Sequence, residues 1–206
     1  MTVGAPPSLL PTQSPLAKVI PHPLRATLTC HSATPSRAVR GIELDISRAG
    51  DSGVALRYAL AGEVSRLLVP TRKAPSRADR LSQHTCFELF CAAATGAAYY
   101  ELNFSPSTDW AICRFTGYRE GMANVEVQRA PQIVVDQHAT GLELQVIIDL
   151  AALPELRGAS AIHAAASAVI EDVDGSLSYW ALTHPSRRPD FHHPDAFALA
   201  LDRSDA

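Results

Sequence analysis

The chain has 206 residues, of which 47% are hydrophobic and 19% are charged, and its formal net charge is −3. This length is enough for one domain with a sizeable core, and the composition excludes a wholly disordered chain. The slightly acidic balance provides no basic field for nucleic acid, and no apolar run approaches the roughly 18 residues of a membrane span. We therefore expect neither nucleic acid nor a membrane as a partner.

Residues 1–23 form a proline-rich leader in which Lys18 is the one charged side chain. Prolines such as Pro7 and Pro11 interrupt the apolar core that a secretory signal requires. The sequence predicts a flexible leader outside the fold and a cytoplasmic protein. The cysteines agree with a reducing compartment, since they show no C-x-x-C spacing and are expected to be small buried hydrophobes; they are Cys30, Cys86, Cys91 and Cys113.

Residues 24–206 are predicted to form a single all-β domain, a β-sandwich of about ten to twelve short antiparallel strands. Short alternating or apolar runs recur about every ten residues and are bounded by Gly, Pro, Asp or Ser. The expected strands are 24–30, 39–47, 53–60, 85–91, 99–104, 110–115, 125–129, 132–136, 142–148, 162–170, 177–182 and 197–201.

Three segments do not follow this pattern of short strands. Residues 70–83 are charged and are predicted to be a loop, and Asp149 is placed to cap one short helical turn. Residues 159–168 are ambiguous because their alanines suit a helix. Ile162, Val169 and Ile170, together with the position of the segment, favour a core strand of small residues.

The hairpin around Thr95-Gly96 predicts a definite register, because glycine supplies the positive φ of a tight turn. One face then carries apolar pairs, which are Phe87 with Phe104, Leu89 with Leu102 and Cys91 with Tyr100. The other face carries Glu88 opposite Asn103, Phe90 opposite Glu101 and Cys86 opposite Ser105. This polar face is either a solvated outer surface or the floor of a ligand pocket.

Residues 105–109 are predicted to be a turn, after which Trp110 opens the next strand. Trp110 is either a core residue or a flat platform on which a sugar ring stacks. The spacing does not decide which face Arg114 occupies. An ion pair with Glu101 is the first expectation if the two residues share a face.

Residues 178–195 form a cluster rich in aromatic side chains, prolines and histidines, predicted to end in an ordered loop. His184, His192 and His193 are suitable metal ligands, but adjacent histidines in extended backbone point apart. We therefore expect no metal site and predict histidines that hydrogen-bond to loop carbonyls. The segment Asp172-Val173-Asp174-Gly175 is predicted to be a hairpin turn rather than a calcium loop.

Catalytic motifs for nucleotide, serine-hydrolase or metalloprotease chemistry are absent from the sequence. Cys86 lies in an expected interior strand and is interpreted as structural. Glu88 and Glu101 could form a glycosidase pair, but the sequence fixes neither their separation nor their pKa values. We predict a protein with no catalytic residues.

Two dense motifs resemble a known family. They are Thr85-Cys86-Phe87-Glu88-Leu89-Phe90 with Tyr99-Tyr100-Glu101-Leu102-Asn103-Phe104-Ser105-Pro106, and Tyr179-Trp180-Ala181-Leu182 with Pro189-Asp190-Phe191-His192-His193-Pro194. On these motifs the chain resembles a DOMON-like domain, in the bacterial subgroup related to carbohydrate-binding module family nine. The resemblance covers roughly residues 24–202. It implies an immunoglobulin-like or jelly-roll β-sandwich whose pocket takes a sugar or haem.

The resemblance also implies site residues. Sugar-binding relatives use aromatic rings flanked by polar groups, which here correspond to Trp110 and Trp180 with Glu101, Asn103 and His184. Haem-binding relatives use a methionine and a histidine. Met122 lies in no matching motif, so no cofactor is expected.

The predicted function is therefore a non-catalytic domain that binds a small ligand, a sugar or sugar derivative. The first alternative is an interaction or structural module without a small ligand, in which both tryptophans are core residues and the polar face meets water. A haem-binding domain or an enzyme is a further alternative. The identity of the ligand and the oligomeric state stay open.

Overall fold

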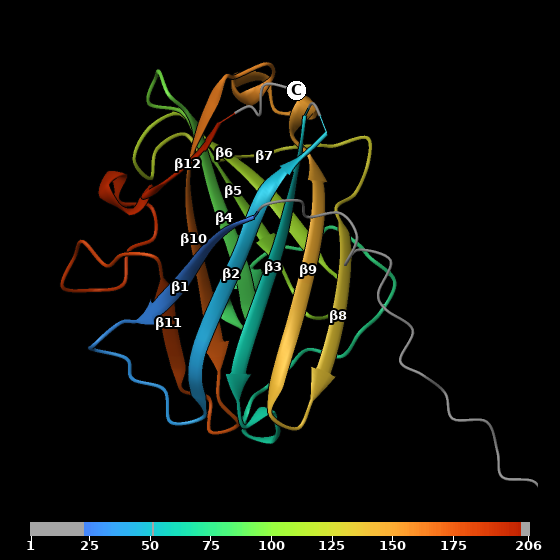
Figure 1. Cartoon of the computed structure of the whole chain (residues 1–206), viewed down its shortest axis with the longest axis vertical. Coiled ribbons are helices and arrows are strands. Elements are labelled where there is room, and N and C mark those ends of the chain that lie inside the picture. Colours follow the sequence, from blue (N-terminus) through green and yellow to red (C-terminus); the bar gives the residue numbers. More distant parts are fainter. Residues whose placement is uncertain (1–22, 51, 203–206) are drawn as a thin grey trace, which may run out of the picture.

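The computed structural model describes residues 23–50 and 52–202, so the predicted leader, apart from Pro23, lies outside the described residues. The described chain is almost entirely β structure (Figure 1). Its strands are β1 Leu24–Cys30, β2 Val39–Ala49, β3 Gly53–Gly62, β4 Cys86–Ala93, β5 Tyr99–Phe104, β6 Trp110–Phe115, β7 Ala123–Asn124, β8 Gln132–His138, β9 Gly141–Asp149, β10 Ala161–Glu171, β11 Leu177–Ala181 and β12 Leu199–Asp202.

Helical structure in the described residues is confined to short 3₁₀ turns, at Val64–Arg66, Leu81–Gln83, Leu150–Ala152, Pro154–Leu156 and Pro194–Ala196. Asp149 caps one of them as predicted, since its carboxylate accepts the backbone N–H of Ala151 at 2.9 Å. None of these turns has the length or apolar character to cross a membrane. The all-β prediction is confirmed.

All strand pairs are antiparallel and make two layers (Figure 1). The front sheet has the order β1-β2-β3-β9-β8, and the back sheet has the order β7-β6-β5-β4-β10-β11, with β12 also paired to β10. Strand β1 joins them, because Leu24–Leu28 pair with β2 while Thr29 and Cys30 pair with β11. The layers therefore form a β-sandwich linked along one side.

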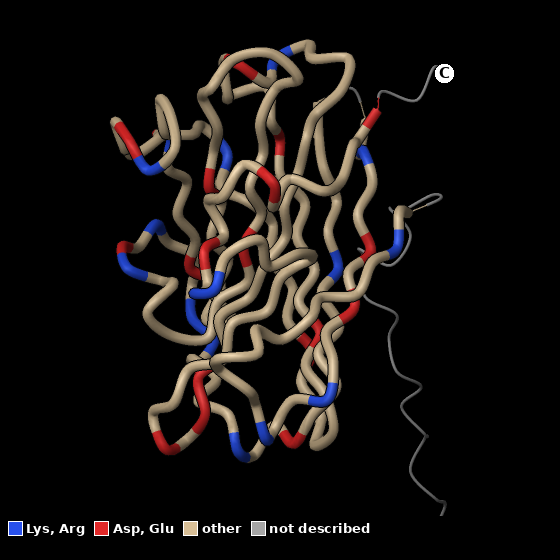
Figure 2. The backbone as a smooth tube through the Cα atoms, turned by 90° about the vertical axis from the view of Figure 1, so that its left-hand side faces the viewer, with Lys and Arg blue, Asp and Glu red and all other residues tan. Residues whose placement is uncertain are grey.

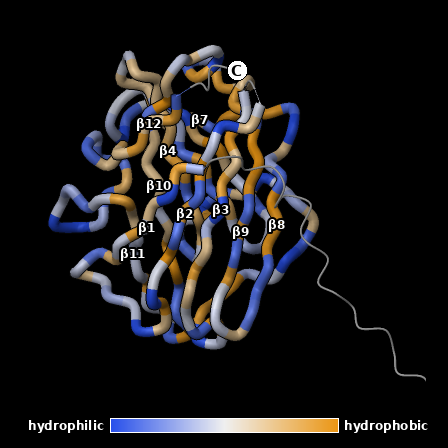
Figure 3. Tube along the Cα trace, viewed as in Figure 1, coloured by the Kyte–Doolittle hydropathy of each residue, from blue (hydrophilic) through white to orange (hydrophobic). Residues whose placement is uncertain are grey.

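The main core lies between the two sheets. Alternate residues of β2 and β3 meet alternate residues of β4, and fully buried examples are Leu44, Leu56, Phe87 and Leu89. Hydrophobic and hydrophilic residues alternate along the front strands (Figure 3), as expected for a sheet with one buried face. Lys, Arg, Asp and Glu are interspersed on the side of the molecule shown in Figure 2.

The back sheet is buried on both faces. Its outer face carries a second apolar cluster that includes Phe90, Tyr99 and Phe115, packed against Phe191 and Ala196. The last two residues belong to the segment 183–198, which we call the C-terminal loop. This covering explains why strand β4 is buried from Cys86 to Cys91 without alternation.

Strand β10 resolves the ambiguous alanine segment as a strand. It pairs with β4 along one edge and with β11 and β12 along the other, and its side chains from Ala164 to Ile170 are buried on both faces. Ala166 and Ala168 face the main core, whereas Ala165 faces the second cluster. Tertiary packing therefore overrides the helical preference of alanine here.

The predicted hairpin register is confirmed, with Glu88 opposite Asn103 and Phe90 opposite Glu101. The ladder ends at Ala92 and Tyr99, so the loop is wider than a two-residue turn. Gly96 at its tip has φ +98°, the left-handed backbone for which glycine is suited.

The strand predicted at 125–129 is wrong. Strand β7 ends at Asn124, and beyond it the backbone N–H of Val125 makes one further bond, to the carbonyl of Ile112 at 2.9 Å. Val125 and Val127 pack against the main core from a loop. Their apolar character covers the core rather than extending a ladder.

The alanines of β10 are closely packed in the main core, so a larger side chain at one of them should be destabilising. Ala168→Leu is expected to lower the free energy of unfolding by about 1–3 kcal/mol, because Ala168 is fully buried between Phe87 and Trp180 on the neighbouring strands. Urea unfolding measures the change, with the exposed Ala200→Leu as the control. An unchanged midpoint for Ala168→Leu would contradict the packing described.

Candidate ligand-binding site

A cavity of about 240 Å³ opens on the outer face of the back sheet, beneath the C-terminal loop. We call it the sheet pocket. Strands β4 and β5 supply its floor, and β11 and the C-terminal loop supply its walls. The lining side chains used below are Glu88, Phe90, Glu101, Tyr179, Phe191 and His192, with Arg119 from the loop after β6.

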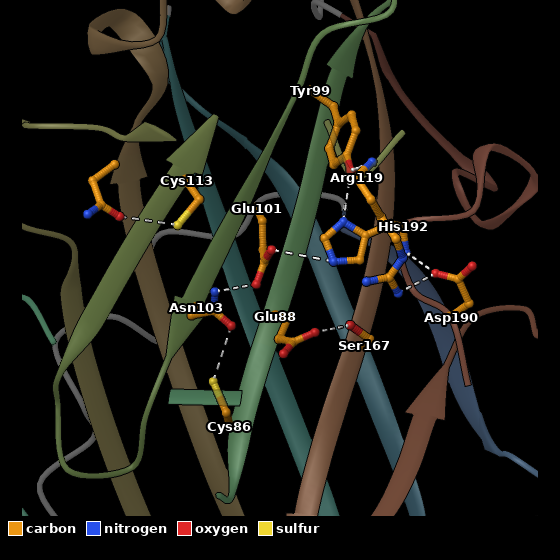
Figure 4. A network of polar contacts seen from close by, with 11 residues as sticks. Cys86, Glu88, Tyr99, Glu101, Asn103, Cys113, Arg119, Ser167, Asp190 and His192 are labelled. Atoms are coloured by element: carbon orange, nitrogen blue, oxygen red, sulfur yellow. Dashed lines mark hydrogen bonds and ion pairs between the residues drawn. The ribbon is translucent and has the colours of Figure 1, made fainter. Parts of the chain in front are cut away.

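The floor of the sheet pocket is polar and buried (Figure 4). Glu88 is 2% exposed and accepts a hydrogen bond from Ser167 Oγ at 2.9 Å. Glu101 accepts one from Asn103 Nδ2 at 2.7 Å, and Asn103 is itself buried. Asn103 Oδ1 accepts a contact from the Cys86 thiol at 3.6 Å. The polar face is therefore not the solvated surface that was one of the two interpretations of the sequence.

The wall contributed by His192 is fixed by a chain of hydrogen bonds. The Tyr99 hydroxyl accepts the backbone N–H of Arg119 at 3.1 Å and lies 2.8 Å from His192 Nδ1. Burial, followed by the charge of Arg119, lowers the pKa of His192 to about 4, so the ring is neutral at pH 7. Tyr99 then donates to Nδ1, and Nε2 carries its proton 3.6 Å from Glu101 Oε2.

A single carboxylate holds the C-terminal loop over the floor. Asp190 accepts Arg119 Nη2 at 2.7 Å and the Tyr118 hydroxyl at 2.5 Å, and its Oδ1 also accepts the backbone N–H of His192 at 3.2 Å. Arg119 and Tyr118 keep the pKa of Asp190 below its ordinary value, against the effect of burial. These contacts fix the two residues that follow Asp190, which are Phe191 and His192.

The surroundings of the two floor carboxylates, Glu88 and Glu101, shift their pKa values to different extents. Burial, followed by the negative charge of Glu101, raises the pKa of Glu88 to about 8, although the Ser167 hydroxyl opposes the shift. Burial also raises the pKa of Glu101, while Asn103 and Arg119 lower it. At pH 7 the floor therefore presents a protonated Glu88 beside Glu101, offering both a donor and acceptors to a polar ligand.

Of the five predicted binding residues, Glu101 lines the sheet pocket, and Asn103 lies beside it and donates a hydrogen bond to its carboxylate. The others lie elsewhere. Trp110 and Trp180 are 7% and 5% exposed and belong to the main core, and the Trp180 indole N–H donates to Ser178 Oγ at 3.1 Å. Both tryptophans therefore match the core interpretation that the sequence left open.

His184 lies near β1 rather than at the floor of the sheet pocket. Its Nε2 is 2.8 Å from the carbonyl oxygen of Thr29, and its ring meets His31 edge-on at 4.8 Å. Burial lowers the pKa of His184, which favours the neutral ring. His184 is therefore a hydrogen-bond partner of a carbonyl, as predicted, but that carbonyl belongs to strand β1 and not to a loop.

Arg114 and Glu101 do not share a face, so the condition for an ion pair between them is not met. Strand alternation puts these residues on opposite faces, because Glu101 is opposite Cys113 while Arg114 is opposite Tyr100. Arg114 Nε instead donates to Glu155 Oε1 at 2.6 Å.

Sequence reasoning did not assign Ser167, Arg119, Tyr179 or Phe191 to a binding site, and it considered His192 as a metal ligand. The prolines that flank segment 189–194 mark Phe191 and His192 as part of an ordered loop. The sequence does not indicate which surface of the protein this loop packs against. No cluster of three or more potential metal ligands occurs among the described residues. Met122 is 60% exposed, so it does not fit the haem alternative.

No protein-family model and no curated protein matches the chain. A putative carbohydrate-binding protein from Bacteroides uniformis has a similar structure, with TM-score 0.64 and 15% identity over 87% of this chain and 86% of that one. A carbohydrate-binding module of family nine (CBM9) from Caldicellulosiruptor kristjanssonii, solved with glucose, has TM-score 0.53 and 9% identity over 98% of this chain and 95% of that one. The fold is CBM9-like.

The placement of the tryptophans predicts their effect on stability. Trp110→Ala and Trp180→Ala are each expected to lower the free energy of unfolding by about 3–5 kcal/mol, because each leaves a large cavity in the main core. Urea unfolding tests this, with Met122→Ala at an exposed position as the control. A loss below about 1 kcal/mol for either variant would place that ring outside the core.

The buried floor also predicts a pH dependence. The folded chain holds a proton on Glu88 up to about pH 8, whereas an unfolded glutamate loses it near pH 4.5. Stability should therefore fall as pH rises from 6.5 to 8, by up to about 1.4 kcal/mol per pH unit. The lowered pKa of His192 acts in the opposite direction, but this effect fades as the pH rises above the ordinary value of 6.5.

Urea unfolding at several pH values between 6.5 and 8 measures this slope. Glu88→Gln should flatten it, because the amide does not titrate. An equally steep slope in the variant would show that another group is responsible.

Proposed function

We propose that this chain is a non-catalytic binding domain whose sheet pocket holds a sugar or sugar derivative, and that it belongs to the DOMON-like subgroup related to CBM9. The observation that carries the proposal is a polar floor beneath aromatic walls, in which Glu88 and Glu101 line the cavity and the buried Asn103 donates a hydrogen bond to Glu101. Sugar rings combine hydroxyl groups with an apolar face, and such a site complements both.

The chemistry of the sheet pocket suits this ligand class. Glu101 and the protonated Glu88 can exchange hydrogen bonds with hydroxyl groups, while Phe90, Tyr179 and Phe191 offer apolar and aromatic surface. The cavity, about 240 Å³, is smaller than the roughly 300–1,000 Å³ of a drug-sized site. It therefore fits one ring-sized ligand better than an extended chain. A small sugar would also suit the predicted cytoplasmic location, because cell-wall polysaccharides lie outside the cytoplasm.

The alternative of a structural module without a ligand is less well supported. On that hypothesis the polar face would meet water, whereas Glu88 and Asn103 are 2% and 5% exposed. A carboxylate is costly to bury, and Glu88 is buried where a cavity opens. The fold-level likeness to proteins named as carbohydrate-binding favours sugar over other small molecules.

A binding screen tests the proposal. Thermal shift against neutral monosaccharides and disaccharides should identify a stabilising sugar, which adds about 2.7 kcal/mol at one hundred times its Kd. Glu101→Gln should then weaken binding about tenfold or more in calorimetry, because an amide nitrogen replaces one of the carboxylate oxygens that accept hydrogen bonds from the ligand.

Asp136→Asn is the matched control, since it removes an exposed carboxylate on β8 and should leave binding as in the parent chain. Binding that survives Glu101→Gln unchanged would move the site away from the sheet pocket. A screen in which no sugar stabilises the protein would count against the function itself.

A further inference from the structure

The two carboxylates in the sheet pocket point to a narrower class of ligand. We propose that the sheet pocket recognises an amino sugar, whose protonated amino group binds between the carboxylates of Glu88 and Glu101. This inference deepens the proposed function and rests on it. It concerns the charge of the ligand, which the CBM9-like fold does not specify.

Glu88 has an acceptor oxygen without a donor. Its Oε2 accepts from Ser167, and no described residue donates a hydrogen bond to Oε1 (Figure 4). The residue is 2% exposed and lines the cavity. Because Glu88 lines the cavity, this oxygen is available to a donor that a ligand would bring.

Glu101 leaves a second oxygen available. Its Oε1 accepts from Asn103, whereas its Oε2 lies 3.6 Å from His192 Nε2, which is longer than a hydrogen bond. Because Glu101 pairs with Phe90, two residues after Glu88, the carboxylates are diagonal neighbours on one face. An ammonium group has three N–H donors and can reach both.

The charges around the pocket also favour a cation. Among the described lining residues, Arg119 alone has a permanently cationic side chain. Its guanidinium already binds Asp190 at 2.7 Å. His192 is neutral, so it adds no positive charge. A ligand carboxylate or phosphate would meet Glu101 with no free cation to balance it, which disfavours acidic sugars.

The groups packed around the floor from the described strands β4, β10 and β11 are a thiol, a hydroxyl and a phenol and include no further carboxylate or ammonium group. From β4 the thiol of Cys86 faces the floor, and burial raises the pKa of that thiol well above its ordinary value. Ser167 on β10 brings a hydroxyl and Tyr179 on β11 brings a phenol ring, and on the core side the Tyr58 hydroxyl donates to the backbone carbonyl of Glu88 at 2.6 Å. Glu88 and Glu101 therefore control the charge that a ligand meets.

Binding should release a proton. Glu88 in the empty pocket is mostly protonated at pH 7, because burial and Glu101 raise its pKa to about 8. An adjacent ammonium group favours the ionised form. The protonated Glu88 and the ammonium ligand then give a carboxylate–ammonium pair, and the carboxyl proton goes to the solvent.

Titration calorimetry with glucosamine, glucose and N-acetylglucosamine tests this, because the three differ in whether one position carries an ammonium, hydroxyl or acetamide group. At pH 7 we expect glucosamine to bind about tenfold or more tightly than the two neutral sugars. Measurements in two buffers of different ionisation enthalpy should show up to about one proton released with glucosamine. The two neutral sugars should release none.

Two variants test whether the preference for glucosamine depends on Glu88 and Glu101. In Glu88→Gln the affinity ratio of glucosamine to glucose should fall to near one, and the proton release should disappear. Glu101→Gln should lower the same ratio, which keeps the test valid if Glu88→Gln does not fold. The control Asp136→Asn should retain both the ratio and the proton release.

The outcomes separate the two proposals. Glucose binding as tightly as glucosamine would overturn the amino-sugar inference and leave the proposed function standing. Tighter binding of glucosamine without proton release, or with the ratio intact in both floor variants, would also overturn it. If no sugar binds, the proposed function fails, and the inference fails with it.

Discussion

The carboxylate of Asp190 is the contact on which the organisation of the candidate site depends. It accepts hydrogen bonds from the side chains of Arg119 and Tyr118 and from the backbone of His192. This ties the C-terminal loop to the outer face of the back sheet. Without that cover Glu88 would meet water, and its pKa would return toward the ordinary range of a glutamate. The chemistry of the floor is therefore a consequence of loop docking.

Burial on both faces also explains the character of the back sheet. The front sheet keeps the alternation of a sheet with one wet face, whereas β4 and β10 carry apolar or small residues on both faces. Polar residues persist in this sheet where the cavity opens, at Glu88, Asn103 and Ser167. Each of them has a hydrogen-bond partner, which reduces the cost of burial.

Local rules accounted for most of the strands. Period-two alternation and turn residues located β1, β5 and β6 at their observed bounds, and the turn at Gly96 indicated the register that pairs Glu88 with Asn103. The same rules failed at residues 125–129, because an apolar run has the same composition whether it pairs with a strand or covers a core from a loop. They also left open whether Trp110 faced a ligand or the core.

The sequence by itself determined the β class of this protein, its strand positions and the face shared by Glu88, Asn103 and Glu101, because these follow from neighbours along one hairpin. Only the tertiary structure decided that this face is buried. The residues that complete the site, Ser167 and His192, come from segments far apart in the sequence. Their meeting depends on the pairing of β4 with β10 and on the docking of the C-terminal loop. Such long-range contacts have no local signal, since they are selected by the packing of the whole chain.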